Sequence, residues 1–226
     1  RYLPLACPPE YSVTDWSDND WSGVARRADQ ERIAQKREQI AAQAGRLFAA
    51  QGYERTSVAE IATAVGISPA SVFYYFNDKA ALFRAVFERD LPAPEALIVH
   101  HADAKEPVSA ILDVLGELAK DAIDPGASGM LVELLRRAEH DPDLIAVVGR
   151  TSEVVRDGLA VLIVRGIDDG DIDPALDPIQ TATWLQAIVD ATYLNARPGY
   201  SPLPELRRTA MGYLTTFPSQ GVDHRD

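Results

Sequence analysis

Cysteine and long apolar runs are nearly absent from this 226-residue sequence. Its one cysteine, Cys7, cannot form an internal disulfide or assemble a cysteine-rich metal site. No run of about eighteen apolar residues occurs, so we expect no membrane-spanning segment. The first thirty residues lack the basic and then apolar order of a secretory signal. A cytoplasmic protein is expected, and the missing initial Met suggests a fragment or a processed form.

Signatures of catalysis are missing as well. The sequence contains no nucleophile–base pair, no glycine-rich phosphate loop and no metal-ligand spacing. The tandem His100 and His101 follow Pro94 in an expected loop, and His140 precedes Asp141 at an expected helix junction. These histidines are interpreted as polar linker residues rather than as ligands or bases. We therefore expect no enzymatic activity, no cofactor and no bound metal.

Negative charge is present but unevenly distributed. The net charge is −12. Residues 31–90 hold eight basic and seven acidic residues, whereas residues 91–226 hold eleven basic and twenty-two acidic residues. A nonspecific polyanion binder would be basic throughout. If this protein binds DNA, only its N-terminal part can face the DNA, because phosphates repel the acidic remainder.

Helical periodicity covers most of the chain. Apolar residues recur at intervals of about 3.6 residues, and Gly or Pro separates the segments. No stretch alternates apolar and polar residues long enough to predict a strand. An all-α protein of about nine helices is therefore expected. The predicted segments are residues 27–52, 58–65, 69–75, 77–91, 107–123, 128–139, 142–166, 178–196 and 203–216.

The two short segments have the spacing of a helix-turn-helix, because only Gly66-Ile67-Ser68 separates them. Ser57 and Glu60 form a capping-box pattern at the start of the first segment. Ser68 and Pro69 start the second as N-cap and first helical residue. Any short capped helix pair would have similar caps and apolar spacing, so the pattern alone leaves a purely structural role open.

The second segment carries small or hydroxyl-bearing residues and no long acidic side chain. Such a helix can enter the major groove with its N-terminus, where its dipole favours nearby phosphate. Aromatic hydroxyls such as those of Tyr74 and Tyr75 can donate to phosphate oxygens or pack on thymine methyl groups.

The sequence around the helix-turn-helix narrows the interpretation of this motif. Residues 37–89 read REQIAAQAGRLFAAQGYERTSVAEIATAVGISPASVFYYFNDKAALFRAVFER. This stretch closely resembles the DNA-binding domain of the TetR/AcrR family of bacterial regulators. The resemblance is continuous over about fifty residues. It includes Leu47-Phe48, Gly52-Tyr53, Thr56-Ser57-Val58, Ile61-Ala62, Val65-Gly66-Ile67-Ser68, Phe76, Lys79 and Leu82-Phe83.

The resemblance implies a set of DNA-contacting residues. Thr56 and Ser57 would contact phosphate, the start of the second helix would face base edges, and Lys79 would contact a phosphate. A solvated Lys79 beside Asp78 is the alternative. The full set is Thr56, Ser57, Ser68, Pro69, Ala70, Ser71, Phe73, Tyr74, Tyr75 and Lys79.

Two positions depart from the family pattern. The family often has Tyr where this chain has Phe73, and His where it has Tyr75. The operator preference of a relative therefore does not transfer directly. A basic set precedes or opens the first helix and could reach phosphate or the minor groove, or could form an ordinary solvated face. This set is Arg26, Arg27, Arg32, Lys36 and Arg37.

Four regions are predicted along the chain. Residues 1–30 lack periodicity and are expected to form a disordered extension. Residues 31–92 would form a three-helix, TetR-type helix-turn-helix domain. Residues 93–217 would form a helical domain for effector binding and dimerisation, and residues 218–226 a tail.

The resemblance also implies a homodimer built from the last two helices. One short recognition helix reads few base pairs, whereas two related by a twofold axis read a palindrome. A core-facing stripe would have the same apolar pattern as an interface stripe. The candidate interface residues are Ala182, Leu185, Val189, Leu206, Ala210 and Leu214.

An effector pocket is expected in the same region, and plain core residues are the alternative for each candidate. Trp184 stands out because a buried indole N–H needs a partner. No charged residue marks an anchor, so a mainly apolar ligand is expected. The candidates are Met130, Leu134, Leu135, Val155, Leu159, Leu162 and Trp184.

The predicted function is sequence-specific regulation of transcription. The expected protein is a homodimeric repressor that a small ligand releases from a palindromic operator. Two alternatives are a module that binds DNA or dimerises without a ligand, and an activator. The expected partners are double-stranded operator DNA, a second copy of the chain and a small-molecule effector, with no membrane.

Overall fold

The computed structural model describes residues 21–197 and 199–215. Cys7, the first twenty residues of the predicted extension and the predicted tail at 218–226 lie outside the described residues. The chain divides into two compact units, residues 1–37 and residues 38–226. In the first unit the described part is helical and belongs to α1 (Trp21–Gln51). This helix begins at Trp21, earlier than the predicted start near Arg27.

The first unit carries charged residues on an exposed helix. Arg26, Arg27 and Arg32 are exposed, and the Arg32 guanidinium lies 2.9 Å from the Asp29 carboxylate. Ile33, which lies seven residues before Ile40 and therefore on the same side of the helix, is 37% exposed. The apolar pattern therefore corresponds to burial only from Ile40 onwards, within the second unit.

In the second unit, three short helices follow α1. They are α2 (Val58–Val65), α3 (Pro69–Tyr75) and α4 (Lys79–Asp90). Each begins at a side-chain cap: Ser57, Ser68 and Asp78 each accept a hydrogen bond from a backbone N–H in the first turn. These caps stabilise helices that would be marginal in isolation. The predicted caps at Ser57 and Ser68 are confirmed.

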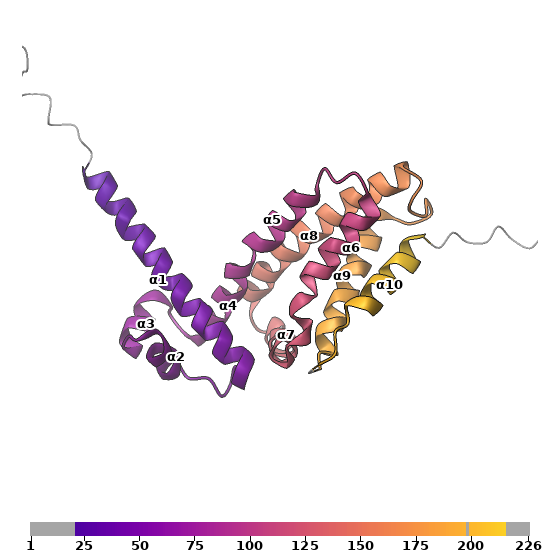
Figure 1. Ribbon diagram of the computed structural model, residues 1–226. Coiled ribbons are helices and arrows are strands. Elements are labelled where there is room, and N and C mark those ends of the chain that lie inside the picture. Colours follow the sequence, from indigo (N-terminus) through magenta and orange to yellow (C-terminus); the bar gives the residue numbers. More distant parts are fainter. Residues whose placement is uncertain (1–20, 198, 216–226) are drawn as a thin grey trace, which may run out of the picture. The chain divides into compact units, whose positions relative to one another are not determined.

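The remaining helices form a bundle, in which Figure 1 shows α5, α6, α8, α9 and α10 lying side by side. The predicted all-α fold is confirmed, because the described residues contain helices and only one isolated bridge, between Arg197 and Tyr200. None of the described helices is long and apolar enough to cross a membrane. The elements are α5 (Pro92–His101), α6 (Pro107–Leu118), the 3-10 helix η1 (Lys120–Ile123), α7 (Pro125–Ala138), α8 (Pro142–Asp168), α9 (Pro178–Leu194) and α10 (Leu203–Thr215).

Helix α5 was not predicted. The chain was expected to continue as a loop through Pro92 and Pro94, with His100 and His101 in that loop. Both prolines instead lie in the first turn of α5, where the missing N–H has no intrahelical partner to lose. The two histidines form the last turn of this helix, with their rings in edge-to-face contact 4.9 Å apart. The loop assignment was therefore wrong.

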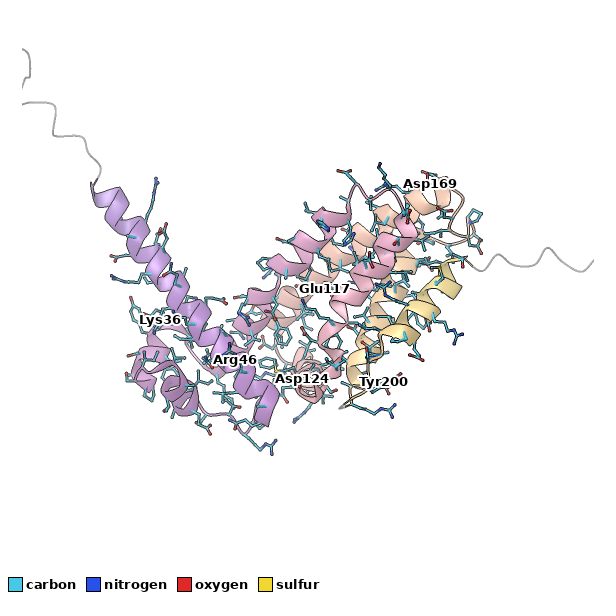
Figure 2. All side chains as sticks on the ribbon, viewed as in Figure 1. Lys36, Arg46, Glu117, Asp124, Asp169 and Tyr200 are labelled. Carbon is cyan, nitrogen blue, oxygen red and sulfur yellow. The ribbon has the colours of Figure 1, made fainter. Side chains whose placement is uncertain are left out.

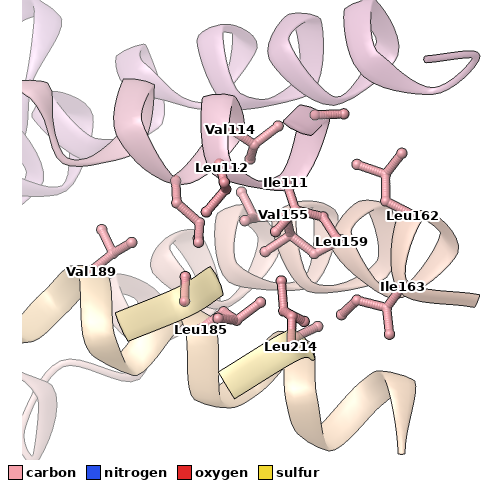
Figure 3. Packing of buried hydrophobic residues seen from close by; sticks show 14 of the residues in the cluster. Ile111, Leu112, Val114, Val155, Leu159, Leu162, Ile163, Leu185, Val189 and Leu214 are labelled. Atoms are coloured by element: carbon pink, nitrogen blue, oxygen red, sulfur yellow. The ribbon is translucent and has the colours of Figure 1, made fainter. Parts of the chain in front are cut away.

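The bundle has its own hydrophobic core. It includes Ile111 and Val114 of α6, Leu159 and Ile163 of α8, and Leu185 of α9, which Figure 3 labels among the packed side chains. All five side chains are fully buried. Burial of a side chain of this size contributes about 1.5–3 kcal/mol. This core shares no buried residue with the cluster beneath the helix-turn-helix.

A second core lies under α2, α3 and α4, and the C-terminal helices complete it. Phe48, Tyr53 and Phe83 pack with ring centroids 5.1–5.5 Å apart. Leu144, from the first turn of α8, is fully buried in this cluster. Met130 and Leu134 of α7 pack against it. The helix-turn-helix region therefore shares its core with α7 and α8.

A buried ion pair reinforces this junction. The Arg84 guanidinium of α4 donates to both carboxylate oxygens of Asp141, at 2.9 and 3.1 Å. Asp141 also caps α8 by accepting the Leu144 N–H at 3.0 Å. The Asp141 side chain is only 10% exposed. One carboxylate thus fixes both the start of α8 and its position against α4.

We expect Asp141→Ala to lower the free energy of unfolding by about 2–4 kcal/mol, because it removes a helix cap and leaves the half-buried Arg84 without its partner. Chemical denaturation followed by circular dichroism measures this loss. Asp143→Ala, on the exposed first turn of the same helix, is the matched control, with an expected loss of about 0.5 kcal/mol. Equal losses in the two variants would contradict the role assigned to Asp141.

Candidate functional site

The helix-turn-helix is held by local hydrogen bonds. The Ser57 hydroxyl accepts from the Glu60 N–H at 3.2 Å, and the Ser57 N–H donates to the Glu60 carboxylate at 2.7 Å. The Ser57 hydroxyl also donates to this carboxylate at 2.8 Å, and the two bonds that the carboxylate accepts from Ser57 lower the pKa of Glu60. Gly66 ends α2 with φ of 71°, a left-handed conformation that a side chain would strain. Ile61, Ala62 and Val72 fill the contact between α2 and α3.

Helix α3 presents an exposed surface at its N-terminal end. Ser68, Pro69 and Ala70 are exposed, and Ser71 is half-buried. The Ser68 hydroxyl accepts the Ser71 N–H at 3.1 Å and lies 2.8 Å from the Ser71 hydroxyl. This end of the helix offers small side chains and hydroxyl groups, which allow a close approach to base edges.

Two aromatic residues extend this surface. Phe73 is 50% exposed and Tyr74 is 73% exposed, whereas Tyr75 is half-buried and packs against the core. The Tyr74 and Tyr75 rings are in edge-to-face contact, with centroids 5.0 Å apart. Large exposed aromatic side chains on a short helix are typical of a binding surface. We name Ser68, Pro69, Ala70, Phe73 and Tyr74 the α3 surface.

Thr56 does not belong to this surface. Its side chain is 1% exposed, and its hydroxyl donates to the Gly52 carbonyl at 2.8 Å. The same hydroxyl lies 3.3 Å from the Leu47 carbonyl. The expected phosphate contact through Thr56 is therefore wrong for this conformation. The residue connects the end of α1 to the start of α2, while its neighbour Ser57 remains exposed.

Lys79 lies at the start of α4, over the ring of Tyr53. Its Nζ is 4.1 Å from the Tyr53 ring centroid and 3.4 Å from the Glu54 carbonyl oxygen. The Arg137 guanidinium of α7 lies 4.0 Å from the same centroid. Burial raises the pKa of Tyr53, and the Arg137 charge opposes that shift. Tyr53 therefore contacts both the lysine predicted to bind phosphate and a cation of the C-terminal helices.

A cavity of about 890 Å³ opens between the second-unit part of α1, α4, η1, α7 and α9. We name it the junction cavity. Val86, Phe87, Met130 and Leu134 form its apolar wall. Figure 2 labels Arg46 and Asp124 on its border. Its other charged residues are Arg89, Asp90, Asp121 and Asp190.

A second cavity, of about 1030 Å³, adjoins the first and shares Asp90, Asp121 and Tyr193 with it. Its remaining walls come mainly from α5, α6 and α10. The Tyr193 hydroxyl donates to the Leu118 carbonyl at 2.6 Å. Burial raises the pKa of Tyr193 to about 12, so the hydroxyl remains a donor at all ordinary pH values. Among the described residues, no group of three metal-ligating side chains comes together.

Comparison with known proteins identifies the family to which this chain belongs. Residues 40–86 match the family model described as bacterial regulatory proteins of the tetR family. The regulator TcmR of Streptomyces glaucescens is 30% identical over 152 residues, which cover 64% of this chain and 67% of that protein. The chain belongs to the TetR family. It is a helix-turn-helix regulator of transcription, and its relatives are regulators rather than enzymes.

Other TetR-family proteins support the assignment. The transcriptional repressor Rv1474c of Mycobacterium tuberculosis is 31% identical over 117 residues, covering 52% of this chain and 58% of that protein. A TetR transcription regulator from Haloarcula marismortui has a similar structure, with a TM-score of 0.68 and 26% identity. That likeness covers 80% of this chain and 97% of the other.

In this TetR-family chain, the predicted dimer stripe faces inward. Its six residues, each at most 6% exposed, belong to the core of the bundle. In the single chain these residues therefore form a core-facing stripe, which was the alternative to an interface stripe. The residues concerned are Ala182, Leu185, Val189, Leu206, Ala210 and Leu214.

The predicted pocket residues do not share one cavity. Met130 and Leu134 line the junction cavity, but Val155, Leu159 and Leu162 are packed in the bundle core. Leu135 is 59% exposed and Trp184 is 55% exposed, so the indole is not a buried group in need of a partner. The carboxylates of the junction cavity had no sequence signal, because each one looks like an ordinary polar residue on its own helix.

We expect Lys79→Ala to weaken binding to every DNA sequence alike and to reduce the salt dependence of binding by about one unit, because a phosphate contact is independent of sequence. Fluorescence anisotropy at several salt concentrations measures both effects. Thr56→Val is the matched control: it should cost about 1 kcal/mol of stability and leave the salt dependence unchanged. A loss confined to one base pair of the site would refute the phosphate role of Lys79.

Proposed function

We propose that this TetR-family regulator is a homodimeric repressor that leaves a palindromic operator when a small molecule binds. The observation that carries this proposal is the α3 surface. It combines a capped helix N-terminus, small residues and two exposed aromatic side chains, and α3 has no acidic residue. Such a surface suits the major groove, where close approach and hydroxyl donors are needed.

The distribution of charge also supports DNA binding through the α3 surface. The segment from residue 31 to residue 90 is nearly neutral, whereas the segment after it holds twice as many acidic as basic residues. DNA phosphates are therefore repelled by the C-terminal helices more strongly than by the nearly neutral helix-turn-helix region. This asymmetry favours binding through one end of the protein rather than along its length.

A dimer is proposed through the outward faces of α9 and α10. Ile179, Trp184 and Leu194 of α9 are 49–55% exposed in the single chain. Met211 and Tyr213 of α10 are 40% and 36% exposed and lie on either side of its buried stripe. An apolar face of this kind is typical of an interaction surface. A twofold axis through it would pair each helix with its own copy and give two α3 surfaces.

The junction cavity is the proposed effector site. Its walls include α1 and α4, which carry the helix-turn-helix core, and also α7 and α9 of the bundle. A ligand that fits only one arrangement of these helices would shift the population toward that arrangement. If that arrangement misaligns the two α3 surfaces, ligand binding lowers operator affinity.

Selection of bound sequences from random double-stranded DNA tests the proposed function. The purified protein should enrich a palindrome whose half-sites lie about 34–36 Å apart, because two α3 surfaces must enter successive major grooves on one face of the duplex. Sequencing of the bound pool provides the measurement. Failure to enrich any sequence would overturn the proposal, and enrichment of a single half-site would overturn the dimer.

We expect Trp184→Glu to raise the dissociation constant of the dimer at least about tenfold, because it places a charge at the centre of the proposed apolar face. Analytical ultracentrifugation over a range of concentrations measures this change. Ile145→Glu on α8 is the matched control, since Ile145 is 47% exposed and lies outside the proposed face. If only Ile145→Glu separates the dimer, the interface is not on α9.

A further inference from the structure

The first part of α1 carries positive charge in an otherwise acidic chain. Residues 21–37, which we name the basic segment, hold five basic and two acidic residues. The rest of the chain holds seventeen basic and thirty-two acidic residues. The excess of positive charge is therefore confined to this segment. Its basic residues are Arg26, Arg27, Arg32, Lys36 and Arg37.

The basic segment has no buried face among its described side chains. Residues 26–35 are exposed, and Lys36 and Arg37 are half-buried. A helix without a buried apolar face gains nothing from a hydrophobic core, and short helices are marginal without such packing. The helical form of this segment would therefore gain stability from a partner.

The residues of the segment select the kind of partner. A protein interface or a membrane-bound helix needs an apolar surface. Between residues 26 and 37 the apolar side chains are only Ala28, Ile33 and Ala34, and their spacing places them on different sides of the helix. A nucleic acid needs cations instead, because its phosphates are closely spaced along the duplex. The segment therefore suits a nucleic acid better than a protein or a membrane.

The segment directly precedes the helix-turn-helix region along the chain. Ile40, three residues after Arg37, is the first buried residue of the core beneath α2, α3 and α4. The fourteen residues from Arg26 to Ile40 span about 21 Å as a helix and more when extended. This length is sufficient to reach phosphates beyond the half-site that one recognition helix contacts, because successive half-sites lie about 34 Å apart.

We propose that the basic segment binds the phosphate groups of the duplex DNA that flanks each operator half-site. The exposed Arg26, Arg27 and Arg32 donate to phosphate oxygens through charge-assisted hydrogen bonds. These contacts add affinity without reading the bases. They lie outside residues 40–86, which match the family model. The inference rests on the proposed function, because it requires a half-site held by the α3 surface.

Two operator duplexes of different length test this contact. The shorter ends at the outer edges of the palindrome that the full chain selects, and the longer carries about ten further base pairs on each side, close to one helical turn. We expect the full chain to bind the longer duplex at least about tenfold more tightly at about 0.1 M salt, because only this duplex offers the flanking phosphates. Fluorescence anisotropy measures both affinities.

Variants that remove charge locate the contact. Arg27→Gln/Arg32→Gln should reduce the advantage of the longer duplex to at most about threefold and lower the salt dependence of binding by at least about two units, because a dimer loses four cations. The ion pair between Arg32 and Asp29 is exposed, so its loss costs little stability. Arg27→Lys/Arg32→Lys keeps the charges and should keep the affinity for the longer duplex within about threefold of the unmodified chain.

Lys105→Gln/Arg150→Gln is the matched control. It removes the same charge from exposed positions after residue 90 and should leave the affinity for each duplex within about twofold. Circular dichroism and thermal denaturation confirm that the variants keep the helical content and the melting temperature of the unmodified chain.

The outcomes separate the two proposals. Equal affinity of the full chain for the two duplexes, or equal effects of the Arg27/Arg32 and Lys105/Arg150 variants, would overturn the flanking contact. In those cases the full chain can still enrich a palindrome, and the proposed function stands. If the full chain enriches no sequence, an unrelated duplex replaces the operator. Binding to it that depends on Arg27 and Arg32, but not on Lys105 and Arg150, supports a phosphate-binding segment and overturns the repressor. Tighter binding to an RNA duplex of the same length would overturn DNA as the partner of the segment.

Discussion

The helix-turn-helix region of this protein does not close its own core. Leu144 of α8 fills the space beside Phe48 and Phe83, and the Arg84–Asp141 ion pair holds α8 against α4. Without these contacts the aromatic cluster would be open to water on one side. The position of the recognition helix therefore depends on the C-terminal helices, and any ligand that moves α7 or α8 acts on the same core.

Tyr53 contacts residues of both the helix-turn-helix region and the C-terminal helices. Its ring contacts Phe48 and Phe83 within the core, and its centroid lies 4.1 Å from the Lys79 Nζ and 4.0 Å from the Arg137 guanidinium. Lys79 begins the helix that follows α3, and Arg137 belongs to α7, which also lines the junction cavity through Met130. Tyr53 thus contacts both the lysine of the proposed phosphate contact and a residue of α7, the helix that forms part of the wall of the proposed effector site.

The uneven distribution of charge explains how an acidic protein can be a DNA-binding regulator. The negative charge that phosphate would repel is concentrated after residue 90, and part of it lines the cavity at Asp121 and Asp190. Phosphate is therefore repelled at the C-terminal helices, and the α3 surface is the face that DNA can approach in the proposed complex.

The sequence by itself determined the all-α class, the family and the local architecture of the helix-turn-helix, because caps such as Ser57 and Ser68 act within one turn. It left open which face of α9 is buried, since this helix carries apolar residues on both faces: Ala182, Leu185 and Val189 turn inward, while Ile179, Trp184 and Leu194 remain exposed. Thr56 likewise matches the family motif, yet its hydroxyl is used inside the protein. Only the tertiary structure decided these points and brought the cavity carboxylates together, because contacts between residues far apart in the chain leave no periodic signal along it.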